Sequence, residues 1–178
     1  MTKNFRLVVA ALIAVVIGII YAAMCYGPIT GKVVDADSGK PIEGAVVLVE
    51  WTRTKGIGLT ATYSYKVAAT ITDKDGKFEL PGTYNPLVNK PILTIYKKGY
   101  VAWNNELIFP GYTKRTNFIW QAEYVVKMEK YNEKYSHDKH VDFIMTSIRS
   151  SLDIESKNKI YKAFEWERKM ALRERMKK

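Results

Sequence analysis

The only two histidines of the chain, His137 and His140, stand three residues apart beside Asp138 and Asp142. Residues three apart share one face of a helix, so two imidazoles and a carboxylate could approach one cation. A lysine separates the histidines, and no further His or Cys is present to complete a tight site. A helix start with Ser136 as its N-cap explains the same residues more simply. We therefore predict no metal site.

A second acidic cluster, Asp73-Lys74-Asp75-Gly76, resembles the start of a calcium-binding loop. The remaining acidic ligands of an EF-hand do not follow it, and these residue types are typical of a β-turn. One cysteine and two histidines leave little material for a nucleophile with an adjacent base. No glycine-rich phosphate loop follows a predicted strand. We therefore expect neither a catalytic centre nor a cofactor.

Aromatic and cationic side chains near one predicted loop are the candidates for binding. Pro110-Gly111 indicates the tip of that loop, and loops on a rigid scaffold often carry recognition residues. Trp103 lies in a polar stretch before the loop, and Tyr112, Lys114 and Arg115 follow it. Large flat rings can stack on sugars or anchor a protein partner. These four residues are the predicted binding site, against the alternative that both rings belong to the core.

The N-terminal segment is strongly apolar. Leu7 to Cys25 forms a run of 19 residues without a charge, preceded by Lys3 and Arg6. Positive charge followed by an apolar helix is the pattern of an export signal or a membrane anchor. Three fates are open: cleavage after Cys25, retention as an anchor, and lipidation of Cys25, although Met24 departs from the lipobox pattern. Each of them predicts an exported protein.

Short segments with a period of two follow from Ile29 onward, separated by turn residues. Residues 45–52 are apolar on both faces at first, whereas residues 63–72 show one apolar face. Shorter apolar segments follow at 78–80, 92–96 and 124–128. Regular short strands divided by turns are typical of a β-sandwich.

Four pieces of sequence share a fixed order: Ile29-Thr-Gly-Lys-Val-Val-Asp35, Ser38-Gly-Lys-Pro-Ile-Glu-Gly-Ala45, Thr72-Asp-Lys-Asp-Gly-Lys-Phe78 and Lys98-Gly-Tyr100. In order and spacing they resemble the carboxypeptidase regulatory-like domain, over residues 27–130. That resemblance implies a transthyretin-like sandwich of seven strands with Greek-key-like connections. Such modules occur in many secreted and surface proteins.

The resemblance implies an accessory module, because in this family the peptidase chemistry lies outside the sandwich. A zinc carboxypeptidase needs a His followed three residues later by Glu, whereas here His140 and Phe143 stand three residues after the two histidines. The family's sandwich is also similar to carbohydrate-binding folds. Glycan binding therefore follows as an analogy of fold alone.

After Lys130 the apolar residues recur at helical spacing. They mark two amphipathic helices, with stripes at Val141, Ile144, Ile148 and Leu152 and at Ile160, Phe164 and Leu172. Residues 155–178 contain nine Lys or Arg and four Glu. These cations could stabilise a helix C-terminus or bind anionic lipid or lipopolysaccharide, and both interpretations stay open.

The length of 178 residues fits one domain with an appendage. A net charge of +10 would suit nucleic acid, but export and the lack of a recognition motif argue against that partner. We predict residues 1–25 as a signal peptide or membrane anchor, 27–130 as the β-sandwich and 131–178 as a basic amphipathic helical extension. The predicted function is non-catalytic binding or assembly through a protein partner in the periplasm or at the cell surface. A carbohydrate-binding module of the envelope is the alternative.

Overall fold

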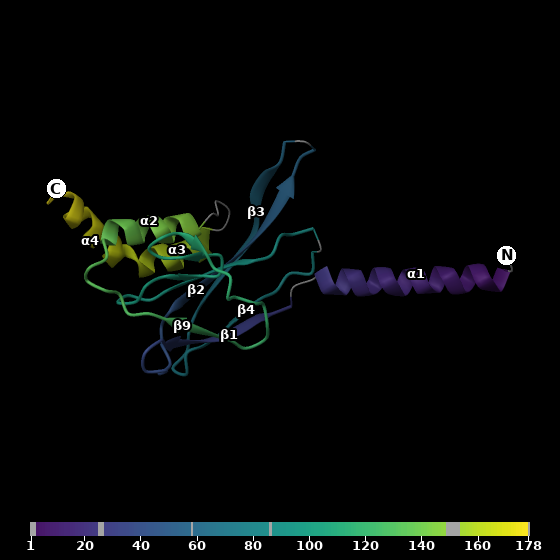
Figure 1. Ribbon diagram of the computed structural model, residues 1–178, viewed down its shortest axis with the longest axis horizontal. Coiled ribbons are helices and arrows are strands. Elements are labelled where there is room, and N and C mark those ends of the chain that lie inside the picture. Colours follow the sequence, from purple (N-terminus) through teal and green to yellow (C-terminus); the bar gives the residue numbers. More distant parts are fainter. Residues whose placement is uncertain (1–2, 25–26, 58, 86, 149–153, 178) are drawn as a thin grey trace.

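The computed structural model describes residues 3–24, 27–57, 59–85, 87–148 and 154–177. Within these ranges the protein is mainly β, with a layer of helices at one side and a separate N-terminal helix (Figure 1). The elements in chain order are α1 (Lys3–Met24), β1 (Ile29–Asp35), β2 (Val46–Lys55), β3 (Ala61–Ile71), β4 (Lys77–Leu80), β5 (Ile92–Tyr96), β6 (Trp103–Asn104), β7 (Leu107–Ile108), β8 (Thr113–Lys114), β9 (Tyr124–Met128), α2 (His137–Ser147), α3 (Ile154–Ala163) and α4 (Glu165–Arg175).

The strands of the described residues form two larger sheets and a small hairpin. One sheet has the order β4-β1-β9, the other β3-β2-β5-β6, and β7 pairs with β8. All pairings are antiparallel except β1 with β9, which is parallel. The register between β2 and β3 shifts at Trp51/Thr52, where a bulge bends the long hairpin.

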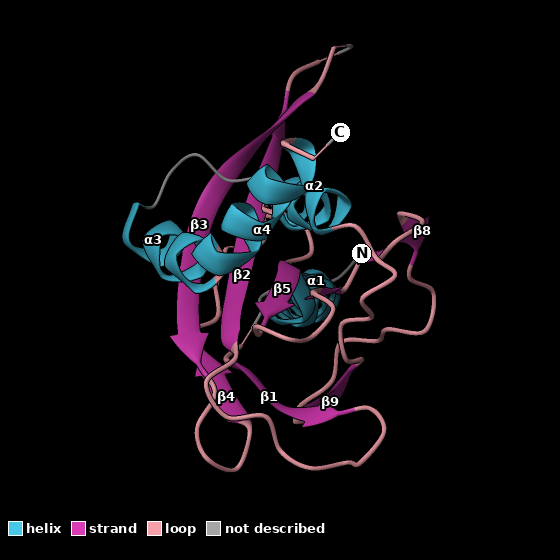
Figure 2. Ribbon diagram, turned by 90° about the vertical axis from the view of Figure 1, so that its left-hand side faces the viewer, coloured by secondary structure: helices cyan, strands magenta, loops and turns pink. Residues whose placement is uncertain are grey.

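The side chains of β2 alternate between two cores. Val47, Val49 and Trp51 are buried between the two sheets, whereas Val46 and Leu48 are buried against the helices. This arrangement confirms the prediction of a strand that is apolar on both faces at its start. Figure 2 shows the helices lying over the sheet that contains β2, β3 and β5, so this sheet is covered on both sides.

Helices α2 and α3, together with the residue that joins α3 to α4, contribute fully buried apolar side chains to the core beneath the helices. Phe143, Ile144, Ile160 and Phe164 are all fully buried there. Ile144, Ile160 and Phe164 belong to the predicted stripes, whereas Phe143 does not. Leu172 is 57% exposed, so its predicted place on the buried side is wrong. Regular helix is interrupted at Phe164, between α3 and α4. The buried residues of α4 are Glu167 and Ala171.

The N-terminal helix α1 extends away from the sandwich as a separate rod (Figure 1). Lys3 and Arg6 fall within it, whereas the candidate lipidation and cleavage position Cys25 lies outside the described residues, as does Leu152. Among the helices of the described residues, none meets the length and hydropathy of a membrane span.

Candidate functional site

Trp103 belongs to the core of the sandwich. Only 6% of the residue is exposed, and its ring lies edge-on to Phe118, with the centroids 5.5 Å apart. The Arg115 guanidinium covers the same ring at 4.7 Å. The expectation that Trp103 is an exposed stacking platform is therefore wrong, because a buried indole has no free face for a ligand. Its neighbours in the sequence are polar, and they led to the prediction that Trp103 is exposed.

Phe118 and Trp120 extend this aromatic packing from the core to the surface. The Phe118 ring stands edge-on to Trp120 at 4.8 Å, and both rings are partly exposed. They line a groove of about 460 Å³ together with Lys90, Lys114 and Arg115. Two predicted binding residues, Lys114 and Arg115, thus lie beside an aromatic pair that the sequence analysis did not single out.

Arg115 is held in a fixed orientation at the base of the groove. Its Nε donates to the carbonyl oxygen of Asn104 at 2.7 Å, and its backbone amide donates to the carbonyl of Glu106 at 2.7 Å. Partial burial lowers the pKa of Arg115 from its usual value. The guanidinium is thus a preorganised cation, since its position is set before any ligand arrives.

Tyr112 lies apart from the groove, against the helical layer. Its ring meets Phe143 of α2 edge-on at 5.5 Å, and the residue is 39% exposed with a φ of 53°. Burial raises its pKa, with a further contribution from Asp142. The fold therefore does not bring Tyr112 to the groove beside Lys114 and Arg115.

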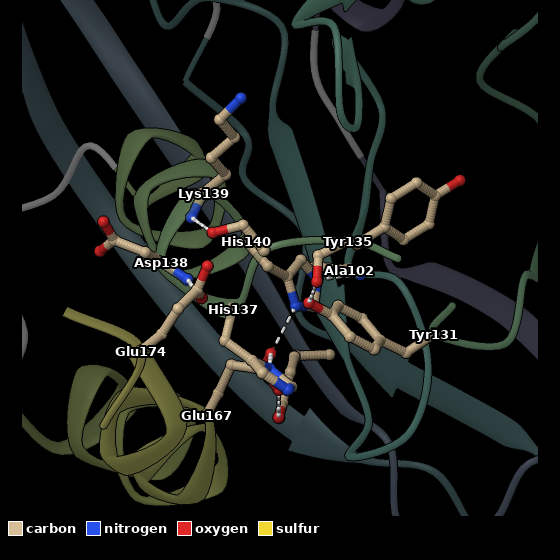
Figure 3. Close-up of polar contacts among 11 residues, drawn as sticks. Ala102, Tyr131, Tyr135, His137, Asp138, Lys139, His140, Glu167 and Glu174 are labelled. Carbon is tan, nitrogen blue, oxygen red and sulfur yellow. Dashed lines mark hydrogen bonds and ion pairs between the residues drawn. The ribbon is translucent and has the colours of Figure 1, made fainter. Parts of the chain in front are cut away.

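A closed polar cluster joins the helices to the sandwich (Figure 3). Glu167 of α4 is 2% exposed, and its Oε1 contacts Nδ1 of His137 at 2.5 Å and Nδ1 of His140 at 3.0 Å. The hydroxyl of Tyr96 in β5 donates to Oε2 at 3.1 Å. The amide of Ala102 donates to Nε2 of His140 at 2.9 Å. One carboxylate thus joins α2, α4 and the sheet.

These contacts fix the tautomer of His140. Because Nε2 accepts the amide of Ala102, the proton must sit on Nδ1 and point at Glu167. Both ring nitrogens are occupied and the residue is fully buried, so His140 can neither ligate a metal nor exchange a proton with a substrate. Among the described residues no set of three metal-ligating side chains has suitable geometry, and Asp138 pairs with Arg175 instead.

Aromatic rings close the outer side of this cluster. Tyr131 stacks on His137 with the ring centroids 4.7 Å apart and an interplanar angle of 12°, and Trp166 meets His137 edge-on at 5.5 Å. The ammonium of Lys98 lies 4.4 Å over the Trp166 ring. The turn after β5 therefore holds α4 by a cation–π contact beside the polar cluster.

Burial and charge together shift the pKa values in the cluster. Burial alone would raise the pKa of Glu167, but the hydrogen bonds from His140 and His137 outweigh it and leave the pKa lowered. Burial and then the negative charge of Glu167 raise the pKa of Tyr96, and the same causes raise that of Tyr131. Glu167 is therefore ionised and the two tyrosines are neutral at physiological pH.

A second polar cluster centres on Asp35. Its carboxylate accepts from the Ser38 amide at 2.7 Å, the Ser38 hydroxyl at 2.8 Å and the Tyr100 hydroxyl at 3.1 Å, with Lys130 at 3.7 Å. The hydrogen bonds from Ser38 are the main cause of a pKa lowered to about 2. Three of the four pieces that carry the family resemblance thus supply residues to one structural contact.

The predicted turn at residues 73–76 is present. Oδ1 of Asp73 accepts the amides of Asp75 at 2.9 Å and Lys77 at 2.8 Å, and Gly76 has a φ of 73°. The carboxylate of Asp73 is thus engaged with its own backbone, as in an ordinary self-capped turn.

Glu167 is the central residue that the sequence analysis missed. A signal was present, because Ile160, Phe164, Glu167 and Ala171 recur at spacings of four, three and four. A glutamate on the apolar stripe of a helix requires buried partners, and the two histidines of the chain were candidates for that role. Glutamate and lysine are abundant in this segment, which made the position look like part of a solvated face.

Comparison with known proteins leaves the family of the chain open. No protein-family model matches it, and no curated protein matches it either. Among solved structures it is similar to a streptococcal ancillary pilin, with 18% identity and a TM-score of 0.33 over 61% of this chain and 30% of that chain. A 9R-lipoxygenase from Cyanothece PCC8801 matches with 14% identity and a TM-score of 0.31, over 62% of this chain and 18% of that chain. The chain thus spans less than a third of either structure.

Proposed function

We propose that this chain is a non-catalytic binding and assembly module of the cell envelope, exported through its N-terminal segment. The sandwich in this proposal is of the transthyretin-like kind found in carboxypeptidase regulatory-like domains, with seven strands and Greek-key-like connections. The order of the four sequence pieces supports that assignment. The mutual hydrogen bonding of His137, His140 and Glu167 supports a non-catalytic role, because it leaves the buried histidine without a free nitrogen.

The groove beside β8 is the observation that carries the proposal. It combines the partly exposed rings of Phe118 and Trp120 with the cations Lys90, Lys114 and Arg115. Aromatic and arginine side chains are the residue types that dominate the binding energy of protein interfaces. The cations outnumber the one acidic lining residue, so the occupant that fits best is an acidic segment of a protein partner with an apolar anchor.

Site-specific photo-crosslinking in the native envelope tests this proposal. Ile119 lies between the two rings and is 74% exposed, so a crosslinker there should capture one partner that mass spectrometry identifies. The same crosslinker at Lys74, in the exposed β3–β4 turn, is the control. With the identified partner purified, Trp120→Ala and Lys114→Glu should each weaken binding at least about tenfold, the effect of about 1.4 kcal/mol. Binding that is insensitive to both variants would refute the groove as the interface.

A glycan is the second candidate occupant, favoured by the same pair of partly exposed rings. Sugar rings stack on tryptophan through their apolar faces, and Trp120 rather than Trp103 would be the platform here. Glycan binding by the purified chain that is lost in Trp120→Ala, together with no crosslinked protein at position 119, would favour this alternative.

A further inference from the structure

Three segments of the chain meet at one end of the sandwich. The start of β1 lies opposite the end of β4, because Ile29 pairs with Leu80. The segment after β4 then runs along the β2–β3 hairpin, where Asn89 donates its amide to the carbonyl of Thr52 at 2.8 Å and its side chain to Thr54 at 3.1 Å. Helix α1 precedes β1, so it also leaves from this end, and the hairpin projects from the sandwich at a steep angle to α1 (Figure 1).

The tips of these segments expose apolar side chains. Ile57 and Leu59 at the turn of the hairpin are 103% and 94% exposed, and Tyr84 and Leu87 after β4 are 70% and 68% exposed. Single exposed apolar residues are common, but four large ones on two loop tips at the same end of the sandwich exceed such scatter. They lie at the tips of loops and not in the groove described above, so this surface is distinct from the proposed partner site.

The two projecting segments carry only positive charge, whereas Glu79, which pairs with Thr30, and Glu123, whose amide donates to the Thr30 hydroxyl, lie at the start of β1. Residues 51–71 and 81–91 contain Arg53, Lys55, Lys66 and Lys90 and no Asp or Glu. The guanidinium of Arg53 lies 5.4 Å over the ring of Tyr65, along the arms of the hairpin and behind its apolar turn. The opposite end carries the acidic turn at residues 73–76. The two projecting segments therefore combine apolar tips with cations, and the carboxylates near them belong to β4 and to the residue before β9.

We propose that this end of the sandwich rests on a bilayer surface with anionic head groups. The apolar tips enter the boundary between head groups and acyl chains, and the cations and tyrosines behind them lie at the level of the head groups. Apolar tips followed by aromatic and basic side chains are the arrangement with which proteins enter a membrane interface. A protein partner would instead require a continuous surface, whereas these tips project singly. The basic end of α4 lies at the far side of the helical layer from α1 (Figure 1).

Depth-dependent quenching of a fluorescent label tests the proposal on the full chain. In a Cys25→Ser background, which removes the one native cysteine, Leu59→Cys and Lys74→Cys are each labelled with an environment-sensitive dye. Vesicles of phosphatidylcholine alone or with phosphatidylglycerol carry shallow spin-labelled lipids. We expect a blue shift and strong quenching at position 59 with phosphatidylglycerol, and neither at position 74.

The variant Arg53→Glu/Lys55→Glu should lose the quenching at position 59 while its melting temperature stays unchanged, because both side chains are outside the core. Three results would overturn the proposal. They are a label at position 59 that stays as water-exposed as the one at 74, equal quenching in phosphatidylcholine alone, and shielding at 59 only in native envelopes with crosslinking to a protein. The labelled positions and the substituted residues all lie outside the groove, so the proposed protein partner is tested separately.

Discussion

Substitution of Glu167 by alanine leaves three hydrogen-bond donors without their shared acceptor. The Tyr96 hydroxyl and the Nδ1 atoms of His137 and His140 all point at this carboxylate, and Tyr96 and His140 are at most 1% exposed. An unsatisfied buried donor costs about 1–3 kcal/mol, and the substitution leaves two such donors in the core and a third, on His137, that is more exposed. We expect the free energy of unfolding to fall by about 3–5 kcal/mol, which is a large part of the ~5–15 kcal/mol that stabilises a typical domain.

Urea unfolding of the full chain in detergent, followed by circular dichroism, measures this change. Hydrogen exchange should show that protection is lost first in α2 and α4, because their contact depends on the carboxylate. Glu165→Ala is the matched control on the same helix: its side chain is 58% exposed and pairs with Lys169 at 3.0 Å, so it should cost no more than about 0.5 kcal/mol. Glu167→Gln keeps an acceptor for the histidines and should cost about 1–2 kcal/mol. If Glu167→Ala is no more destabilising than Glu165→Ala, the polar cluster around Glu167 is not what holds the helices against the sheet.

Three further outcomes follow from the fold. Gly76→Ala should destabilise far more than Gly39→Ala in urea unfolding: both glycines have positive φ, but a Cβ at Gly76 would lie 2.4 Å from a backbone oxygen, whereas nothing lies within 4 Å at Gly39; equal effects would contradict this. The pKa of Asp35 is lowered to about 2 by its hydrogen bonds, so its contribution is complete above its usual 3.8 and is lost as the pH falls through 2; a carboxyl resonance that titrates near 3.8 in NMR would count against the contact. Phe164→Ala should cost about 3–5 kcal/mol and Leu172→Ser almost nothing in thermal unfolding, since one is fully buried and the other 57% exposed; the reverse order would refute the helix placement.

The β-structure could be predicted from the sequence because its signals are local. Alternation along residues 45–52 depends only on which neighbours are apolar, and turn residues such as Gly76 act within four positions. The N-cap at Ser136 is equally local, and its side chain does accept the amide of Lys139 at 3.3 Å. The seven-strand Greek-key topology depends on pairings between distant segments, and it stays a prediction.

The candidate site residues were harder to predict because their burial depends on segments that are distant in the sequence. Trp103 looked exposed among polar neighbours, yet Phe118 and Tyr124 cover it from a later segment. Glu167 looked solvated among lysines, yet its partners stand 27 and 30 residues earlier in α2 and 71 residues earlier in β5. Local charge indicates a surface only when no distant partner is available.

Helices α2, α3 and α4 cover β2 and β5, yet they are the last part of the chain to be synthesised. Val46, Leu48 and Tyr96 are synthesised long before Ile160 and Phe164, which later shield them. Until those last segments emerge, the half-made sandwich must present an apolar sheet face to its surroundings. A nascent chain of this protein is therefore vulnerable to aggregation or proteolysis until its C-terminal helices are delivered. A chain cut before Ile160 should remain in that state permanently.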